Sequence, residues 1–452
     1  MITPARPEDR CAGAYDAKDG IMTTTRIDET LAGERGPVAR GLDRRTMLRM
    51  AGVAMVAPWV TGGAAGAASA AQGRGKPGAG PAAPAVDPAL SLARAFDFLD
   101  ERTSLAPGTE GFLPRSYTGG YLGSIGYDVA FVYDCALVIL AHLARGTVDD
   151  VARATKVGDV LVTAQLTDPA GDGRLRTSYM SSPAVGPRGP DVAGAATMTG
   201  NQAWAGMAFV RLYEHTGAPR FLEAALRTAT FVASTTFDER GVGGFSGGSN
   251  ADGAPLTWRS TEHNTDCVAF FAQLGRVTGD GTWTQHAERA RVFVRSMWQG
   301  THFHIGTLLD GVTPNTSPIV EDVQTWTYLA LRETAYASSL DFAWTKLVTT
   351  DGPVTGARVV VTTQKKVWLE GTAHLACALA TRGATGDATR AATLRTGIWT
   401  AQTTVPNADG RGIPAASSDG LTTGEGDVFY TSLHTGATAW AVFAALGVNP
   451  FA

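Results

Sequence analysis

From about residue 88 to its end, the chain repeats one pattern: an apolar helical stretch, a turn, and an amphipathic helical stretch. The segments 200–235 and 262–297 align with each other in this way, each with a polar opening and a Thr-Gly turn. The same pattern recurs at 127–165, at 370–402 and, with a less clear turn, at 323–348. A single pair of this kind cannot bury its apolar face, so we expect the repeated pairs to pack against one another.

The two ends of this region each carry one helical stretch without a partner. Residues 87–104 have no helix before them to pair with, and residues 434–447 have none after them. Joining the two makes a sixth hairpin and closes a ring, so we expect 92–104 to pack beside 434–446. The first stretch of each pair is apolar on nearly all sides and is expected inside the ring, whereas the second carries charges on one face and is expected outside.

The sequence therefore predicts an all-α toroid with an inner and an outer ring of helices. The inner helices are expected to open near residues 127, 200, 262, 323, 370 and 434. Long glycine-rich loops precede several of them, for example 238–258 and 407–430. Because the inner helices run parallel in such a ring, their N-termini and these loops gather at one end. A concave, polar face rich in backbone N–H groups is predicted there.

Six αα-hairpins with acidic residues at the inner-helix openings resemble the six-hairpin glycosidase superfamily, the (α/α)6 barrels. The resemblance covers nearly all of 88–452 and rests on architecture and repeat number, not on a diagnostic motif. Many glycoside hydrolases, some polysaccharide lyases and some sugar epimerases share this fold. The resemblance implies an (α/α)6 toroid with long loops on one face and a carbohydrate substrate, but a fold alone does not select the reaction.

Carboxyl groups at the inner-helix openings are the first candidates for catalysis. Glycoside hydrolysis generally needs two of them, an acid and a base or nucleophile. Glu262 has Asp266 one turn further along its helix, and Glu370 follows Trp368, so the surroundings of both glutamates would raise a carboxyl pKa. We expect Glu262 and Glu370 to act as acids. The expected bases are Asp322 and Asp128.

Aromatic, amide and imidazole side chains accompany these acids. Indole rings stack on the apolar faces of sugars, while carboxylates and amides bind sugar hydroxyls. The residues expected to bind substrate are Asn201, Trp204, His263, Asn264, Asp266, Gln324, Trp326, Trp368, Glu425, Tyr430 and His434. The alternative is that the acids are ordinary helix caps and the indoles ordinary core. In the stretch "STEHNTD" (260–266), Thr261 is expected to cap the helix and leave Glu262 facing the cleft.

Two other functions remain open on the same residues. A lyase or an epimerase would move a proton with His263, His374, His434 or Tyr430. His302 and His304 lie in "THFHIG", which reads as a strand that places both rings on one side. A sugar-binding toroid without catalysis is the third possibility.

Composition and cysteine spacing exclude other classes of function. The net charge of −4 and the lack of a basic run argue against a nucleic-acid partner. Cys135, Cys267 and Cys377 are expected inside the inner helices, but no pair of cysteines or histidines has the spacing of a zinc site. We expect buried free thiols, no metal and no cofactor, and a monomer.

The first 87 residues resemble an export segment followed by a linker. Arg44 and Arg45 precede an apolar run at 47–60 and then small residues, as in a twin-arginine signal peptide with cleavage near Ala71. The apolar run is too short to span a bilayer, so no stable membrane anchor is expected. The predicted organisation is a signal peptide with a long basic region (1–71), a Gly/Pro/Ala linker (72–87) and a catalytic toroid (88–452), located outside the cytoplasm.

Overall fold

The computed structural model describes residues 87–182, 189–362, 364–423 and 427–452, all of which belong to one compact unit. The expected signal peptide, nearly all of the linker, and Glu425 lie outside the described residues. None of the helices within the described ranges has the length and apolar character that crossing a membrane requires.

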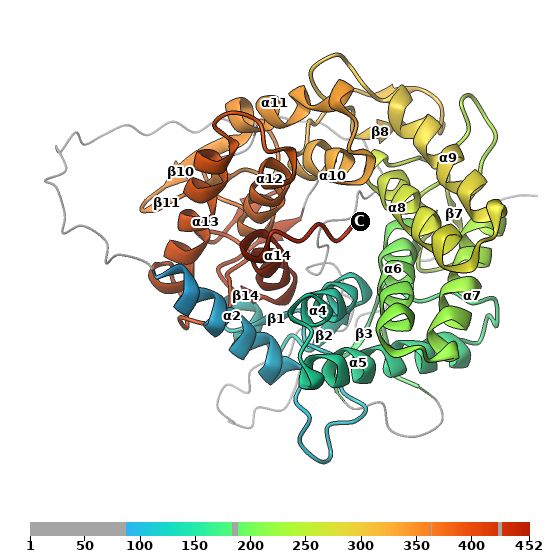
Figure 1. Cartoon of the computed structure of the whole chain (residues 1–452), viewed down its shortest axis with the longest axis horizontal. Coiled ribbons are helices and arrows are strands. Elements are labelled where there is room, and N and C mark those ends of the chain that lie inside the picture. The colour runs from blue at the N-terminus through green and yellow to red at the C-terminus, as the bar shows by residue number, and fades with distance from the viewer. Residues whose placement is uncertain (1–86, 183–188, 363, 424–426) are drawn as a thin grey trace, which may run out of the picture. The chain divides into compact units, whose positions relative to one another are not determined.

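Six helices of the described chain form the inner ring that the sequence predicts. They are α4 (Val132–Arg145), α6 (Thr199–Thr216), α8 (Thr261–Thr278), α10 (Glu321–Leu331), α12 (Leu369–Arg382) and α14 (Thr435–Leu446). Each contacts the next one along the chain, and α14 contacts α4, so the ring is closed (Figure 1). Every inner helix is buried along most of its length, as expected for helices that are apolar on nearly all sides.

The outer ring is formed by the second helix of each pair. It consists of α5 (Val148–Thr167), α7 (Pro219–Thr235), α9 (Gly281–Ser296), α11 (Ser338–Leu347), α13 (Asp387–Thr404) and α2 (Pro88–Arg102). The first of the described helices, α2, packs on the last one, α14, which confirms the expected pairing of the two ends (Figure 1). The all-α toroid predicted from the repeat is therefore confirmed.

Short antiparallel strands order the loops before the inner helices. The three-stranded sheets are β2 (Val129–Phe131), β3 (Ser178–Met180) and β4 (Val192–Gly194), and β5 (Thr197–Met198), β6 (Gly248–Ser249) and β7 (Pro255–Leu256). The pairs are β1 (Tyr117–Thr118) with β14 (Leu433–His434), β8 (Gly306–Thr307) with β9 (Pro314–Asn315), β10 (Val348–Asp351) with β11 (Val354–Ala357), and β12 (Leu421–Thr422) with β13 (Val428–Phe429). Two short helical pieces, α3 (Gly120–Ser124) and η1 (Thr334–Tyr336), complete the described elements.

The structure corrects three local expectations. Residues 129–131 form β2, so the first inner helix begins at Val132, and Asp128 precedes a strand, not a helix. Ser260 caps α8, with its hydroxyl accepting from the His263 amide at 3.3 Å. The Thr261 hydroxyl donates instead to the His304 carbonyl, 2.7 Å away. His302 and His304 do not lie in the expected strand: Phe303 makes an isolated bridge with Trp298, and the strand β8 begins only at Gly306.

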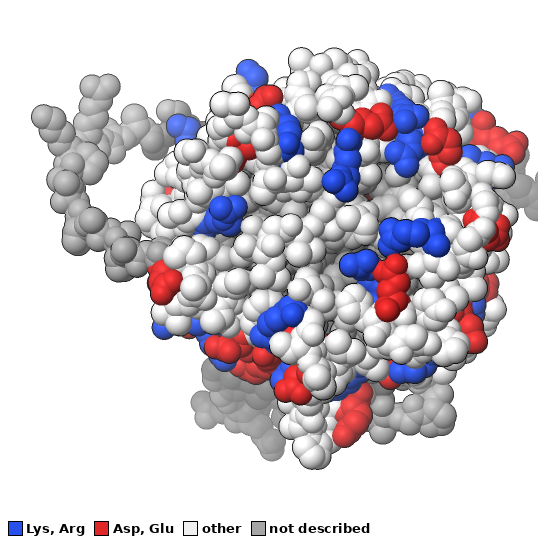
Figure 2. All heavy atoms as spheres, viewed as in Figure 1, with Lys and Arg blue, Asp and Glu red and all other residues white. Residues whose placement is uncertain are grey.

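The C-terminal tail occupies the middle of the ring (Figure 1). It enters at the end where the inner helices finish, since the Asn449 amide donates to the Leu329 carbonyl at 2.8 Å. The Phe451 ring then lies 5.0 Å from Trp204 and 5.7 Å from Trp326, measured between centroids. Figure 2 shows charged side chains of both signs dispersed over this face, without a patch of one sign. The C-terminal tail therefore contributes to the apolar core of the ring through Phe451.

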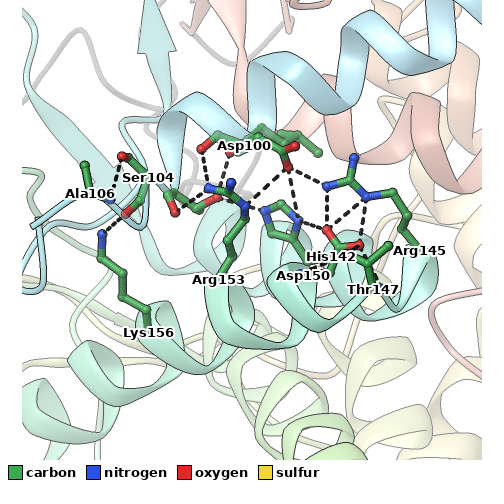
Figure 3. Close-up of polar contacts among 11 residues, drawn as sticks. Asp100, Ser104, Ala106, His142, Arg145, Thr147, Asp150, Arg153 and Lys156 are labelled. Carbon is green, nitrogen blue, oxygen red and sulfur yellow. Dashed lines mark hydrogen bonds and ion pairs between the residues drawn. The ribbon is translucent and has the colours of Figure 1, made fainter.

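An ion-pair network fixes the place where the ring closes (Figure 3). Asp100 comes from α2, His142 and Arg145 from α4, and Asp150 and Arg153 from α5. The Arg145 guanidinium bonds both Asp100 and Asp150, at 2.6 and 2.8 Å, and the His142 ring lies 2.9 Å from Asp150. The Arg153 guanidinium donates to the Asp100 carbonyl at 2.8 Å. Three helices from two neighbouring hairpins are joined here.

Phe451→Ala tests whether the tail is part of the core. Phe451 is buried, and its removal leaves a cavity beside three indoles, so the free energy of unfolding should fall by about 3–5 kcal/mol. Urea denaturation followed by circular dichroism measures this. The control is Phe112→Ala at a ring that is 36% exposed, which should change little. Equal effects of the two substitutions would show that the tail is not integral to the ring.

Candidate active site

Carboxylates and imidazoles from the first two turns of four inner helices, with His434 from the end of β14, meet inside the ring. The carboxylate–imidazole cluster consists of Asp134 on α4, Asp266 on α8, Glu321 and Asp322 on α10, Glu370 and His374 on α12, and His434. All seven side chains are buried, and Asp322 is the most exposed of them at 7%. The parallel inner helices bring them together because each contributes its N-terminal end.

Within this cluster, acids and imidazoles alternate. His434 lies between two carboxylates, with Nε2 3.3 Å from Asp134 Oδ1 and Nδ1 3.4 Å from Glu370 Oε2. His374 lies between two others, with Nδ1 3.3 Å from Glu321 Oε2 and Nε2 3.7 Å from Glu370 Oε1. Glu370 is thus held between both imidazoles, at the centre of the series.

A hydrogen-bond relay adds to the restraint on Glu370. The Trp440 indole N–H donates to the Tyr133 hydroxyl at 2.8 Å, and that hydroxyl donates to Glu370 Oε1 at 2.7 Å. Burial alone would raise the pKa of Glu370, but the imidazoles of His374 and His434 and the Tyr133 hydroxyl outweigh it and lower this pKa below its usual value. Glu370 is therefore an ionised carboxylate in a buried place.

Three other acids of the cluster have pKa values shifted the opposite way. Burial raises the pKa of Glu321 to about 7 and that of Asp322 to about 6, although the His374 charge opposes both shifts. Burial and the nearby charge of Asp322 raise the pKa of Asp266 well above its usual value. Protonated and ionised carboxyl groups therefore lie next to each other near neutral pH, the condition that acid–base catalysis needs.

The same electrostatics determine the charge of the histidines. Burial lowers the pKa of His374, but Glu321 and Glu370 outweigh it and raise the pKa to about 9. The charges of Asp134 and Glu370 raise the pKa of His434 in the same way, against burial. His263 has no such carboxylate partner, and burial lowers its pKa to about 3. The site therefore combines a protonated imidazole, His374, and a second imidazole with a raised pKa, His434, with the neutral imidazole of His263.

Two glycines allow the chain to approach the site closely. A Cβ at Gly200 would lie 2.6 Å from His263 Cδ2 and 3.0 Å from Asp266 Oδ2. A Cβ at Gly436 would collide with Asp134 Oδ1. Each is the second residue of its inner helix, so the "TG" that opens α6 and α14 is the residue pair that leaves room for an acid from the neighbouring helix.

Several buried polar atoms around the cluster lack a hydrogen-bond partner among the described residues. They include both carboxylate oxygens of Asp266, both ring nitrogens of His263, and the hydroxyls of Tyr117 and Tyr127. Buried polar groups are normally satisfied, so an unsatisfied set in one place indicates space for water or a ligand. These atoms make the interior of the ring the candidate place for polar groups that the described residues do not themselves satisfy.

The expected catalytic acids separate into two groups. Asp322 and Glu370 belong to the cluster, and Glu262 is buried in the first turn of α8, 4% exposed. Asp128 is bonded by Arg115, Ser181 and Ser182; against burial, these hydrogen bonds lower its pKa. None of these three partners belongs to the cluster. The pKa directions also reverse two expected roles, since Glu370 is ionised like a base and Asp322 retains a proton like an acid.

Sequence reasoning missed Asp134, although it occupies the first turn of α4. The helix was expected to open near 127, which made Asp128 its acid and placed Asp134 two turns inside. Strand β2 has no alternation of apolar and polar residues that would distinguish it from a helix. The apolar run "VAFV" (129–132) fits a buried helix equally well. Tyr133 and Glu321, both central in the contacts above, were also not selected as site residues.

The amide side chains that were expected to bind substrate mostly bind the backbone of the loops before the inner helices. The Asn264 side chain accepts from the Phe245 amide at 2.8 Å and donates to the Phe245 carbonyl at 2.9 Å. Gln324 makes the same pair of bonds with Phe303, at 2.8 and 3.1 Å. Both amides are therefore occupied by backbone and position the loops that precede α8 and α10. The Asn201 amide makes one long contact, 3.5 Å to the Thr177 carbonyl.

The indoles expected to stack on sugar lie in packed surroundings. Trp204 and Trp326 contact each other at 5.3 Å and surround Phe451 together with Trp440, beneath the carboxylates. Trp368 packs against Phe429 in a second apolar cluster. Their exposed fractions are 3% or less, so protein atoms cover their faces. By contrast, Tyr430 is half-buried, and its ring lies tilted against that of Tyr121 with 4.4 Å between the centroids.

The thiols and one acidic cluster offer no evident metal site. Cys135, Cys267 and Cys377 are free and buried, and burial raises the pKa of all three thiols. Asp100, His142 and Asp150 place possible ligand atoms within 4.8 Å of one another. The Arg145 guanidinium is already bonded to both of these carboxylates, so a protein cation fills the role that a metal would take (Figure 3).

The raised pKa values predict how stability depends on pH. The Asp322 carboxyl titrates near 4 when unfolded and at about 6 in the fold, so its stabilising contribution is fully present below about pH 4 and is lost as the pH rises through 6. From about pH 4 to pH 7, the free energy of unfolding should therefore fall less in Asp322→Asn than in the wild type. The difference between the two falls should be on the order of 2 kcal/mol. Urea denaturation at both pH values measures this.

Asp128→Asn is the control, because the pKa shift of Asp128 has the opposite sign. Asp128 contributes stability above its unfolded pKa, so its removal should weaken the fold at pH 7 more than at pH 4. If both variants showed the pH dependence of the wild type, the assignment of the two shifts would be wrong.

No protein family and no curated relative matches the sequence. Solved structures do match the fold. A D-mannose isomerase superposes with a TM-score of 0.59 at 11% identity, covering 79% of this chain and 97% of its own. The cellobiose 2-epimerase of Bacillus thermoamylovorans gives 0.57 at 10% identity, over 78% and 97% of the two chains. The GH76 α-mannanase of Bacteroides thetaiotaomicron gives 0.53 at 11%, over 81% and 96%.

These structures belong to the superfamily that the six hairpins resemble. Both the isomerising and the hydrolysing proteins align over nearly their full length, so the likeness extends across the whole ring and is not limited to a few helices. Identity of 10–11% establishes the shared fold and leaves the reaction to be argued from the site. The chain has the (α/α)6 fold of the six-hairpin glycosidases.

Proposed function

We propose that the chain is an exported carbohydrate-active enzyme that hydrolyses O-glycosidic bonds at the carboxylate–imidazole cluster. The observation that supports this best is the contrast between two acids of the cluster. The pKa of Asp322 is raised to about 6, whereas that of Glu370 is lowered. A glycoside hydrolase needs one carboxyl group that gives a proton and a second that is ionised.

The two acids then have separate roles. Asp322 donates its proton to the glycosidic oxygen as the bond to the anomeric carbon breaks. The ionised Glu370 stabilises the positive charge that develops on that carbon and takes a proton from the attacking water. Glu370 then releases that proton to solvent and Asp322 regains one from solvent, so each cycle consumes one water and restores both acids. His374, His434 and Tyr133 keep Glu370 ionised through the contacts described above.

A sugar isomerase or epimerase is the second candidate, and one observation favours it. His263 is neutral, and neither ring nitrogen has a hydrogen-bond partner among the described residues. A neutral imidazole can take a proton from carbon beside a carbonyl, whereas His374, with a pKa of about 9, is already protonated near neutral pH, and the pKa of His434 is raised as well. Two of the proteins that share the fold are an isomerase and an epimerase by name.

Mass analysis of the products separates these functions. The purified protein is incubated with a panel of soluble glycans. Products that gain one water per cleavage support hydrolysis, an unsaturated end means elimination, and an unchanged mass with a changed sugar means epimerisation or isomerisation. If a glycan binds but no product forms, the protein is a sugar-binding toroid without catalytic activity.

Asp322→Asn tests the acid directly. Because asparagine cannot donate the proton, kcat should fall by roughly 10²–10⁴-fold. The melting temperature at pH 7 should not fall below that of the wild type, because the variant escapes the stability loss that ionisation of Asp322 causes. In the wild type, kcat should decline above about pH 6 as Asp322 ionises. Asp310→Asn is the control. The Asp310 carboxylate bonds Thr313 in its own exposed hairpin, and its backbone carbonyl accepts from Arg240, so it has no contact with the cluster. Normal turnover by Asp322→Asn would remove Asp322 from the mechanism.

Glu262→Gln asks whether the first turn of α8 has a catalytic acid or a structural one. A catalytic Glu262 predicts lost turnover with an unchanged melting temperature. A structural Glu262 predicts normal turnover with a stability loss of about 1 kcal/mol, the value of a helix-terminal interaction.

Export is tested separately from catalysis. The twin-arginine pair should be needed for secretion, so replacing both Arg44 and Arg45 by lysine should hold the precursor inside the cell. Immunoblots of cell and culture fractions report the outcome. Normal secretion of the double variant, or a mature N-terminus far from Ala71, would contradict the assignment.

A further inference from the structure

We propose that the site accepts uncharged carbohydrate and excludes uronates and sulfated sugars. This inference rests on the proposed function, because it concerns the substrate of the same cluster. The argument starts from the charges inside the ring. Five carboxyl groups meet there, and the positive groups that contact them are the imidazoles of His374 and His434.

Neither imidazole is available to a new anion. His434 is already within 3.4 Å of two carboxylates, Asp134 and Glu370. The His374 ring lies 3.3 Å from Glu321 and 3.7 Å from Glu370. The positive charge of each is therefore shared between protein acids.

Arginine and lysine do not compensate. Within the described ranges, no arginine or lysine forms a hydrogen bond or an ion pair with Asp134, Asp266, Glu321, Asp322 or Glu370. Three basic side chains of the loops before the inner helices are used elsewhere. Arg115 pairs with Asp128, and the buried Arg259 pairs with Asp238 at 3.0 Å. Lys366 donates to the Asp419 carbonyl.

An anionic sugar would meet unfavourable electrostatics in this ring. A carboxylate or sulfate group loses its hydration on entry and needs a partner of opposite charge to offset that loss. Here it would meet the ionised Glu370 and would drive further protons onto Asp322 and Asp266. Binding of an acidic analogue should be weaker by roughly 100-fold or more than binding of the neutral sugar.

Neutral sugars, by contrast, match the groups that are left unsatisfied. A hydroxyl both donates and accepts, so it can pair with the Asp266 oxygens, with the His263 ring nitrogens, and with the Tyr117 and Tyr127 hydroxyls. Each of these atoms is buried and lacks a hydrogen-bond partner within the described part of the chain. Among the described residues, the cluster offers many hydrogen-bond acceptors and weak donors, and no arginine or lysine contacts its acids, which is the pattern suited to polyols.

The test uses the mature chain carrying Asp322→Asn, so that bound glycans are not consumed. An array that holds neutral glucans, mannans and galactans beside uronate-containing and sulfated glycans gives the first measurement. We expect the bound glycans to be uncharged. Equal or stronger binding of an acidic glycan overturns the inference, and so does an array on which no neutral glycan binds.

A matched pair gives the second measurement. The neutral glycan that binds best is compared by calorimetry with the same glycan oxidised at C6 to the carboxylate. The oxidised form should bind at least about 100-fold more weakly, and Glu370→Gln, which removes the ionised carboxylate, should narrow this ratio, whereas Asp310→Asn should not. A ratio near one, or one unaffected by Glu370→Gln, would contradict the argument from charge.

The outcomes for substrate class and for reaction are distinguishable. If neutral glycans bind but the wild type never cleaves them, the hydrolase proposal fails and the inference on substrate class stands. If the wild type cleaves an acidic glycan, the inference fails and the hydrolase proposal stands.

Discussion

The arrangement of the site depends on one buried carboxylate, Glu370, held between two imidazoles. A lone carboxylate at this depth would take up a proton, because burial disfavours its charge. His374, His434 and the Tyr133 hydroxyl keep it ionised. Its charge in turn raises the pKa of both histidines, so the protonation states of the three groups depend on one another. Asp322 retains its proton in part because the Glu370 charge lies nearby.

This electrostatic balance requires the closed ring. Glu370 and His374 come from α12, His434 from the strand before α14, and Tyr133 from α4, so the contacts join residues separated by more than 200 positions. The ion pairs of Asp100 and Arg145 join α2 to α4, and the tail packs Phe451 beneath the indoles (Figures 1 and 3). Close approach of the helices also needs glycine at 200 and 436. The packing and the chemistry of the site therefore depend on the same helix starts.

The ring could be predicted from the sequence, because a repeated pattern of apolar and amphipathic stretches has few ways to bury itself. Asp322, Glu370 and His434 could be found for the same reason, since they open inner helices. Asp134 could not, because the boundary between β2 and α4 is invisible in an apolar run. The roles of Asn264 and Gln324 depend on loops that the pattern does not place. Protonation depends on partners such as Tyr133, more than 200 residues from Glu370, so the sequence alone could not show that the pKa of Glu370 is lowered and that of Asp322 raised.

The most direct test of this account measures the two carboxyl groups themselves. With ¹³C-labelled carboxyl carbons, the chemical shifts of Asp322 and Glu370 can be followed from about pH 3 to 8 and assigned with Asp322→Asn and Glu370→Gln. The account predicts that Asp322 titrates near pH 6 and that Glu370 stays ionised to below its usual range. If Glu370 took up its proton at a higher pH than Asp322, the assignment of acid and base, and the electrostatic balance built on Glu370, would be contradicted.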